Sequence, residues 1–77
     1  MVVKIYSTTW CIDCRMAKDF LKQKKVRFEE MDVQYNHKAA EELSKKSGQN
    51  GVPVIDINGK IIIGFNRSEI KKVLKLK

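Results

Sequence analysis

The sequence predicts an α/β fold in the order βαβαββα, with a four-stranded mixed sheet and helices on both of its faces. Two observations lead to this prediction. A β-rich run at residues 2–7 passes into a stretch with helical periodicity and then into a second apolar run. Further on, Asn58-Gly59 separates two short apolar runs, and this dipeptide is the strongest short signal for a β-hairpin. A chain of 77 residues has room for one domain, which we expect to span residues 1–77.

The first half of the chain supplies a strand, a helix and a second strand. Residues 2–7, VVKIYS, are rich in β-forming side chains. A helix is expected from Cys11 onward, because four apolar residues at one-turn spacing form a single stripe: Met16, Ala17, Phe20 and Leu21. Residues 26–32, VRFEEMD, fit a second strand. A strand–helix–strand unit implies a parallel strand pair with a right-handed crossover.

The second half supplies a helix, a hairpin and a last helix. Asn36 is a favourable N-cap for a helix over residues 37–47, and Asn66 is a favourable N-cap for the last helix. Between them, residues 52–57 and 60–64 form the two antiparallel strands of the hairpin. The last helix is expected to bury three apolar residues, Ile70, Val73 and Leu74.

The chain has a formal charge of +7, from 16 Lys and Arg against 9 Asp and Glu. The lysines are scattered and not interleaved with aromatic residues, so we expect a solvated surface and no nucleic-acid partner; docking of an acidic protein is the alternative. No apolar run approaches the roughly 20 residues of a membrane span, so no membrane partner is expected. The first residues enter a strand pattern without the layout of a signal peptide, which favours a cytoplasmic protein.

Cys11 and Cys14 form a C-x-x-C motif where the first strand passes into the first helix. At positions i and i+3 of a helix, two sulfurs share one face and can close a disulfide. The helix N-terminus stabilises a thiolate at Cys11, which is also the more exposed cysteine by position. We therefore predict thiol–disulfide exchange, in which Cys11 attacks a substrate disulfide and the shielded Cys14 resolves the mixed disulfide.

Other roles for a cysteine pair are less compatible with this context. A structural disulfide suits a cytoplasmic protein poorly, because cytosolic thiols stay reduced. Zinc needs four ligands, whereas the pair and the lone His37 supply three, so no metal site is expected within a monomer. A dimer that binds an iron–sulfur cluster between its two subunits is kept as an alternative from a different functional class.

Val52 and Pro53 stand at the start of the third predicted strand, where a proline is poorly suited to sheet pairing. We expect a cis Val52–Pro53 peptide bond that turns the Val52 backbone toward the cysteines. The N–H and C=O groups of Val52 could then pair with an extended substrate segment, as in strand addition. The alternative is an ordinary trans proline at the beginning of a strand.

Three segments, in the right order, carry a resemblance to a known family: YSTTWCIDC, GVPVIDINGK and GFNRSEI. Over essentially its whole length the chain resembles the glutaredoxins and NrdH-type redoxins of the thioredoxin superfamily. The resemblance implies the thioredoxin-like, glutaredoxin-type form of the predicted fold. It also implies the roles of several residues: Cys11 as nucleophile, Cys14 as resolving cysteine, Val52 and Pro53 as a cis-proline pair, and Trp10 as the aromatic residue before the motif.

The resemblance also bears on the source of electrons. Glutathione-using glutaredoxins carry a basic residue shortly before the first cysteine and aspartates at the start of the last helix, and residues 7–9 and 66–68 supply neither. Gly64-Phe65 instead resembles a segment of NrdH-type redoxins, which implies that Phe65 contacts substrate. We therefore expect a monomeric electron carrier without a cofactor, which reduces a disulfide-containing client protein and is reset by a thioredoxin-reductase-like flavoenzyme. A glutathione-dependent glutaredoxin is the alternative.

Asp13 lies between the two cysteines. As an acid in the first turn it suits the helix dipole, and this is the simpler of its two possible roles. Its carboxylate also opposes a thiolate at Cys11, which favours the disulfide form and makes the couple more reducing. We expect Asp13 to tune the thiolate in this way, toward the thioredoxin value of about −270 mV and away from the glutaredoxin range of about −200 to −230 mV.

Overall fold

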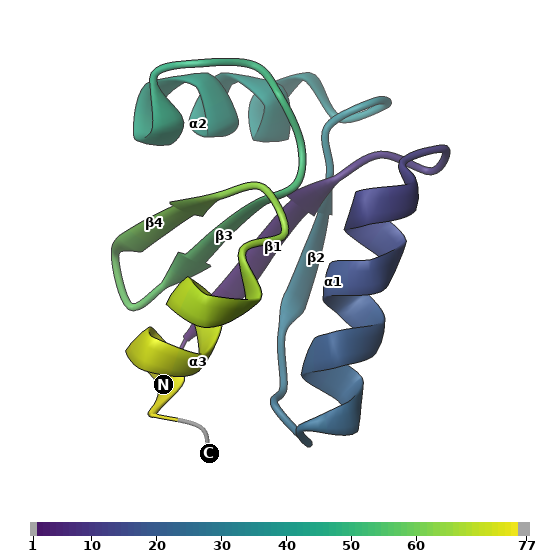
Figure 1. Ribbon diagram of the computed structural model, residues 1–77. Coiled ribbons are helices and arrows are strands. Elements are labelled where there is room, and N and C mark those ends of the chain that lie inside the picture. The colour runs from purple at the N-terminus through teal and green to yellow at the C-terminus, as the bar shows by residue number, and fades with distance from the viewer. Residues whose placement is uncertain (1, 76–77) are drawn as a thin grey trace.

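Residues 2–75, which the computed structural model describes, form four strands and three helices around one mixed sheet (Figure 1). In chain order the elements are β1 (Val3–Ser7), α1 (Ile12–Gln23), β2 (Glu29–Asp32), α2 (His37–Ser47), β3 (Val54–Ile57), β4 (Lys60–Ile63) and α3 (Arg67–Leu74). The strand order is β2-β1-β3-β4, in which β1 and β2 are parallel and the other two pairs are antiparallel. The predicted fold class is therefore confirmed.

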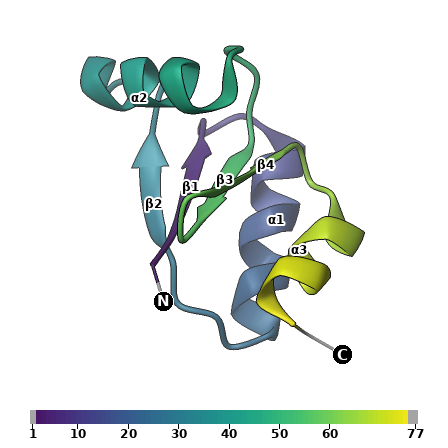
Figure 2. The same ribbon diagram turned by 90° about the vertical axis from the view of Figure 1, so that its left-hand side faces the viewer.

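Different helices cover the two faces of the sheet (Figure 2). α1 and α3 lie together on one face, over a core that includes Ile5 of β1 and Ile55 of β3. On the other face Leu43 of α2 packs with Tyr6 and Val54. Tyr6 pairs with Val54 across β1 and β3, so the loop that enters β3 lies beside the end of β1, where the chain continues into α1. This junction is where the predicted functional residues meet.

β2 is shorter than the sequence pattern suggests, because it begins at Glu29 and not at residue 26. The residues before it are used to turn the chain back from α1. Lys25 has a φ of 58°, and the Val26 backbone N–H donates to the Leu21 carbonyl at 2.9 Å. Val26 nevertheless packs against the apolar core, which explains the hydrophobic pattern that resembled a strand.

The apolar stripe of α1 is wider than the face that the helix buries. Ala17 is completely buried against the sheet, whereas Met16, which belongs to the same stripe, is 48% exposed. In α3, Ile70 and Leu74 are buried as predicted, and Val73 is only partly buried at the margin of the core. A short helix that packs with one face leaves the edge of its apolar stripe in solvent.

The caps and the hairpin turn form as predicted. The side chains of Asn36 and Asn66 accept the backbone N–H three residues on, at 3.1 and 3.2 Å, and so start α2 and α3. Asn58 and Gly59 have φ values of 52° and 94°, which are the positive values that a tight hairpin turn requires at both central positions. These local signals fix where the elements begin and where the hairpin reverses.

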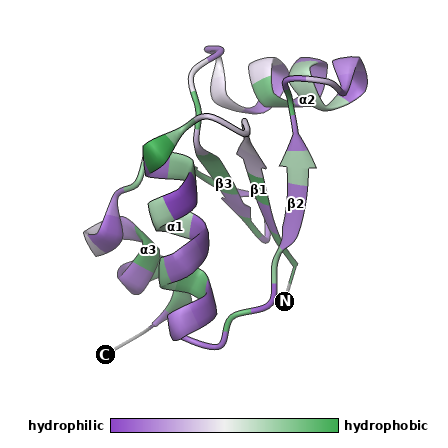
Figure 3. Ribbon diagram, turned by 90° about the vertical axis from the view of Figure 1, so that its right-hand side faces the viewer, coloured by the Kyte–Doolittle hydropathy of each residue, from purple (hydrophilic) through white to green (hydrophobic). Residues whose placement is uncertain are grey.

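Polar residues cover the outward surfaces of the helices (Figure 3). Within the described residues, no helix is both long enough and apolar enough to span a membrane. The start of α1 departs from the polar pattern, because it is coloured hydrophobic and carries Ile12, which is 75% exposed. The junction between β1 and α1 therefore presents an apolar side chain to solvent.

A partly buried polar network joins α2 to the sheet. Lys46 donates to the Asp56 carboxylate at 2.7 Å and to the Tyr6 hydroxyl at 2.8 Å, and Asp56 also accepts the Gly59 backbone N–H at 2.7 Å. Burial acts to raise the pKa of Asp56, but the hydrogen bonds from Lys46 and Gly59 outweigh it and lower that pKa. The hydrogen bonds to Asp56 and Tyr6 raise the pKa of Lys46. The pair therefore stabilises the fold in its charged form.

We expect Asp56→Asn to lower the free energy of unfolding by about 1–2 kcal/mol at neutral pH, because Lys46 loses its charged partner. A carboxyl whose pKa is lowered by folding stabilises the protein above its unfolded pKa of about 3.9, and this contribution is lost as the pH falls through the folded value. Stability of the wild type should therefore fall more steeply in acid than that of the variant. Urea unfolding at several pH values measures the loss of stability at neutral pH and its dependence on pH. Asp19→Asn, at an exposed position, is the control. Parallel pH curves for wild type and Asp56→Asn would contradict this role.

Candidate active site

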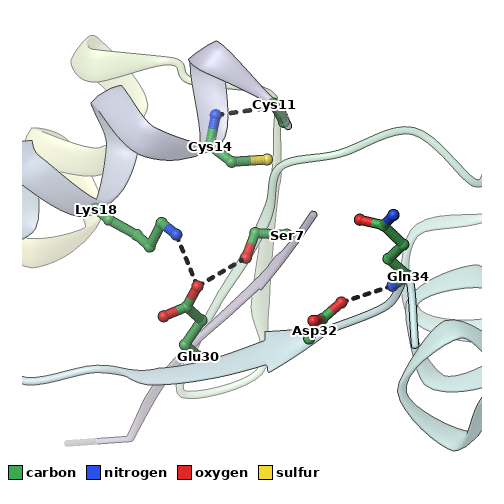
Figure 4. A network of polar contacts seen from close by, with 7 residues as sticks. All are labelled: Ser7, Cys11, Cys14, Lys18, Glu30, Asp32 and Gln34. Atoms are coloured by element: carbon green, nitrogen blue, oxygen red, sulfur yellow. Dashed lines mark hydrogen bonds and ion pairs between the residues drawn. The ribbon is translucent and has the colours of Figure 1, made fainter. Parts of the chain in front are cut away.

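Cys11 is the N-cap residue of α1 and lies where the chain leaves β1. Its backbone is extended, with φ of −91° and ψ of 115°, and the helix begins at Ile12. The Cys11 sulfur accepts the Cys14 backbone N–H at 3.1 Å (Figure 4). The first backbone N–H groups of a helix have no partner within it, and a side-chain acceptor at the N-cap satisfies one of them. The fold thus directs one of the first backbone N–H groups of α1, that of Cys14, at the Cys11 sulfur.

The two sulfurs differ in their access to solvent. Cys11 is partly exposed, whereas Cys14 is completely buried, and both are free thiols. Burial, and then the hydrogen bond with Cys11, raises the pKa of Cys14 to about 12. The Thr8 backbone and the charge of Lys18 act in the opposite direction. The predicted contrast between an accessible and a shielded thiol is confirmed.

The Val52–Pro53 peptide bond is cis, as predicted, and comes just before β3. The Val52 carbonyl oxygen lies 4.0 Å from the Cys11 sulfur. Pro53 is buried, and its carbonyl accepts the Gly64 backbone N–H at 2.8 Å, which fixes this loop to the end of β4. The structure therefore brings the Val52 backbone to the accessible thiol and anchors the next residue in the fold.

Exposed apolar side chains adjoin Cys11 on its outer side. A shallow surface hollow beside the thiol is lined by Thr9, Trp10, Cys11, Ile12 and Arg15. The Trp10 side chain is 83% exposed and that of Ile12 is 75% exposed. Trp10 thus lies at the site as predicted, and Ile12 joins it as a residue that the sequence pattern did not single out. Large exposed apolar groups of this kind are suited to contact with another molecule.

Phe65 is not among the residues that line this hollow. Its ring packs edge-to-face on Phe20, with centroids 5.9 Å apart, and it contacts the core beneath α1 and α3.

Asp13 is exposed in the first turn of α1, where a carboxylate suits the helix dipole. The His37 side chain is 93% exposed and lies 3.5 Å from Glu41. Within residues 2–75, no three His, Cys, Asp or Glu side chains are grouped so as to hold a metal ion.

Near Cys14 lies a cluster of three polar side chains, Lys18, Glu30 and Ser7, which the sequence pattern did not single out (Figure 4). Lys18 follows Cys14 by one helical turn, and its ammonium group pairs with the Glu30 carboxylate of β2 at 2.7 Å. The same carboxylate oxygen accepts the hydroxyl of the buried Ser7 at 3.4 Å. The spacing of four residues between Cys14 and Lys18 was visible in the sequence, but the partners on the two strands come together only in the fold.

This arrangement is suited to the exchange of a dithiol for a disulfide. Cys11 caps α1 and Cys14 lies in its first turn, with the Cys14 backbone N–H bonded to the Cys11 sulfur, and this spacing allows a bond between the two sulfurs. A disulfide from another molecule can reach Cys11, which is partly exposed. The buried Cys14 has Cys11 as its neighbour and hydrogen-bond partner. Accessible and shielded thiols in this order are the parts that such a reaction needs.

Comparison with known proteins agrees with this chemistry. The Glutaredoxin family model matches residues 3–62. An uncharacterized glutaredoxin-like 8.6 kDa protein in the rubredoxin operon of Clostridium pasteurianum is 45% identical, over 96% of this chain and 99% of its own length. Glutaredoxin 3 of Escherichia coli is 39% identical, over 80% of this chain and 75% of its own length.

A solved structure extends the comparison to the fold. The glutaredoxin-like protein NrdH-redoxin from Escherichia coli matches with a TM-score of 0.84 at 26% identity, over 94% of this chain and 93% of that one. The family match spans β1, the C-x-x-C motif and the hairpin up to Ile62. The chain therefore belongs to the glutaredoxin family, as a glutaredoxin/NrdH-type protein of the thioredoxin superfamily, and it is a thiol–disulfide oxidoreductase.

Proposed function

We propose that this protein is a dithiol electron carrier that reduces disulfides of client proteins through Cys11 and Cys14. The observation that carries the proposal is the contrast between the two sulfurs: Cys11 is partly exposed at the N-cap of α1, and Cys14 is completely buried one turn into the same helix. A pair built in this way can attack an external disulfide with one sulfur and protect the other for the second step.

The reaction has two exchange steps. The Cys11 thiolate attacks one sulfur of the client disulfide, a Cys11–client bond forms, and the other client sulfur leaves as a thiolate. Cys14 then gives up its proton and attacks the Cys11 sulfur, which forms the Cys11–Cys14 disulfide and releases the second client sulfur as a thiol. Two electrons have passed from the carrier to the client. A flavoenzyme returns two electrons and restores both thiols.

We assign contact with the client to the surroundings of Cys11. The exposed ring of Trp10 offers apolar area on one side, and the backbone of Val52 lies on another side, with its carbonyl 4.0 Å from the sulfur. Pro53 holds this backbone in place. An extended client segment that approaches Cys11 can pair with it in the manner of strand addition. Phe65 supports the packing of α1 against α3, and we give it a structural role.

The electron source we propose is a thioredoxin-reductase-like flavoenzyme. Residues 7–9 carry no basic side chain, and Ser7 is buried and bonded to Glu30. At the start of α3 the Asn66 side chain caps the helix, and Arg67 lies over the Phe20 ring at 5.4 Å. The chain thus lacks both the basic residue before the motif and the aspartates of the last helix that glutathione-using members of the family carry. The thioredoxin-like activity profile of the Escherichia coli NrdH-redoxin supports the same choice.

The first prediction separates the roles of the two cysteines. Cys14→Ser is expected to accumulate a stable mixed disulfide with a client, because the resolving sulfur is gone, and Cys11→Ser is expected to trap nothing. Mass spectrometry of the non-reduced proteins after exposure to a disulfide-containing protein measures the adducts. Equal trapping by both variants would overturn the assignment.

The second prediction concerns the reductant. Turnover on a protein disulfide is expected to be faster with NADPH and thioredoxin reductase than with NADPH, glutathione reductase and glutathione. The rate of NADPH oxidation, at equal concentrations of this protein, gives the comparison. Turnover that is equal or faster in the glutathione system would establish the glutathione-dependent alternative instead.

The third prediction concerns Asp13. Replacement by Asn removes a negative charge between the two cysteines and is expected to make the redox potential less negative by roughly 10–20 mV, the size of an exposed charge interaction. Equilibration of the protein with a reference dithiol measures the potential. Asp19→Asn, which removes an exposed charge farther along α1, is the matched control. An unchanged or more negative potential in Asp13→Asn would leave this residue as a helix-start acid only.

A further inference from the structure

One step of the reaction depends on a buried thiol. Cys14 is completely buried, and burial is the main reason why its pKa is raised to about 12. A thiol with such a pKa is almost entirely protonated near neutral pH. Resolution of the mixed disulfide nevertheless requires Cys14 to become a nucleophile, and the thiolate is the reactive form. A group that stabilises negative charge on this sulfur would therefore act on the resolving step.

The ammonium group of Lys18, in the polar cluster near Cys14, offers such a charge (Figure 4). Lys18 lies one turn further along α1, on the face that Cys14 also occupies, and its side chain is only 21% exposed. The 2.7 Å pair with Glu30 holds its ammonium group in the space between α1 and β2. Ser7 donates to the same Glu30 oxygen at 3.4 Å from the buried end of β1. Lys18 is thus held by Glu30 of β2, and Glu30, whose own side chain is half exposed, is in turn bonded to Ser7 of β1.

We propose that Lys18, held by Glu30, stabilises the negative charge that develops on Cys14 while the mixed disulfide is resolved. This proposal rests on the proposed function and adds a positioning residue to its second step. In that step the Cys14 S–H bond breaks, the Cys11–Cys14 bond forms, the Cys11–client bond breaks, and the departing client sulfur takes up the proton. Lys18 remains protonated throughout and takes no part in bond making.

The other charged groups around Cys14 do not replace Lys18. On α1 the nearest titratable neighbour is Cys11, which is the partner in the reaction. On β2, Glu30 faces α1 and is neutralised by Lys18, and the Asp32 carboxylate accepts the Gln34 backbone N–H at 2.8 Å (Figure 4). β1 contributes the uncharged Ser7, whereas Asp56 of β3 is paired with Lys46 on the α2 side. Without Lys18, the Glu30 carboxylate would oppose a Cys14 thiolate.

The test is a single-turnover reaction of the reduced protein with one equivalent of a symmetrical nitrophenyl disulfide, which releases one coloured thiolate per exchange. The first release reports attack by Cys11 and the second reports resolution by Cys14. Lys18→Met keeps most of the side-chain length and removes the charge. We expect it to slow the second release by about tenfold and to displace its pH profile by about one unit to higher pH. The first release should change little.

Three further variants make the result specific to charge. Lys18→Arg should keep the rate of the second release, and Lys22→Met, at an exposed lysine one turn further on, should behave as wild type. Glu30→Gln in the Lys18→Met background should recover part of the lost rate, because it removes the opposing carboxylate. Equal slowing of both releases, an unshifted pH profile, or no recovery in the double variant would overturn the proposal.

Failure of the proposed function would look different. If the wild-type protein gave no second release, Cys14 would not be the resolving cysteine, whatever the behaviour of the Lys18 variants. If the wild type gave both releases and Lys18→Met matched it at every pH, only the role of Lys18 would be lost. Urea unfolding of each variant confirms that it is folded, and Lys18→Gln replaces Lys18→Met if the latter is not.

Discussion

A hydrogen bond 3.1 Å long, from the Cys14 backbone N–H to the Cys11 sulfur, joins the first turn of α1 to the accessible thiol. It forms because β1 ends at Ser7 and α1 begins at Ile12, so that Cys11 takes the N-cap position. The helix requires an acceptor there, and here the acceptor is the sulfur that also faces solvent. Cys14, one turn in, is turned toward the sheet and loses its contact with water. The position of the helix start thus determines which thiol is accessible.

Strand pairing supplies the rest of the site. Since Tyr6 pairs with Val54, the residues just before β3 are carried to the end of β1, and the Val52 carbonyl comes to lie 4.0 Å from the Cys11 sulfur. The parallel pairing of β1 with β2 likewise brings Glu30 to the face under α1, where it holds Lys18. The accessible sulfur of the motif therefore faces solvent, whereas Cys14 lies on the side of α1 where Lys18 pairs with Glu30.

The sequence predicted what depends on local signals and missed what depends on packing. The position of the C-x-x-C motif at the start of a helix, the asparagine caps and the Asn58-Gly59 turn were predicted correctly, because neighbouring residues decide them. The exposure of Met16 and the packing of Phe65 on Phe20 depend on how α1 and α3 share one face of the sheet. The Lys18–Glu30 pair joins residues that are twelve positions apart on different elements, so no local pattern reveals it.

The central claim is that the fold makes one thiol accessible and shields the other. Brief alkylation of the fully reduced protein, followed by peptide mass spectrometry, tests it directly by counting the label on each cysteine. The account predicts rapid labelling of Cys11 under native conditions, with Cys14 labelled only when urea unfolds the chain. Labelling of both cysteines at similar rates in the native protein, or of Cys14 before Cys11, would contradict it.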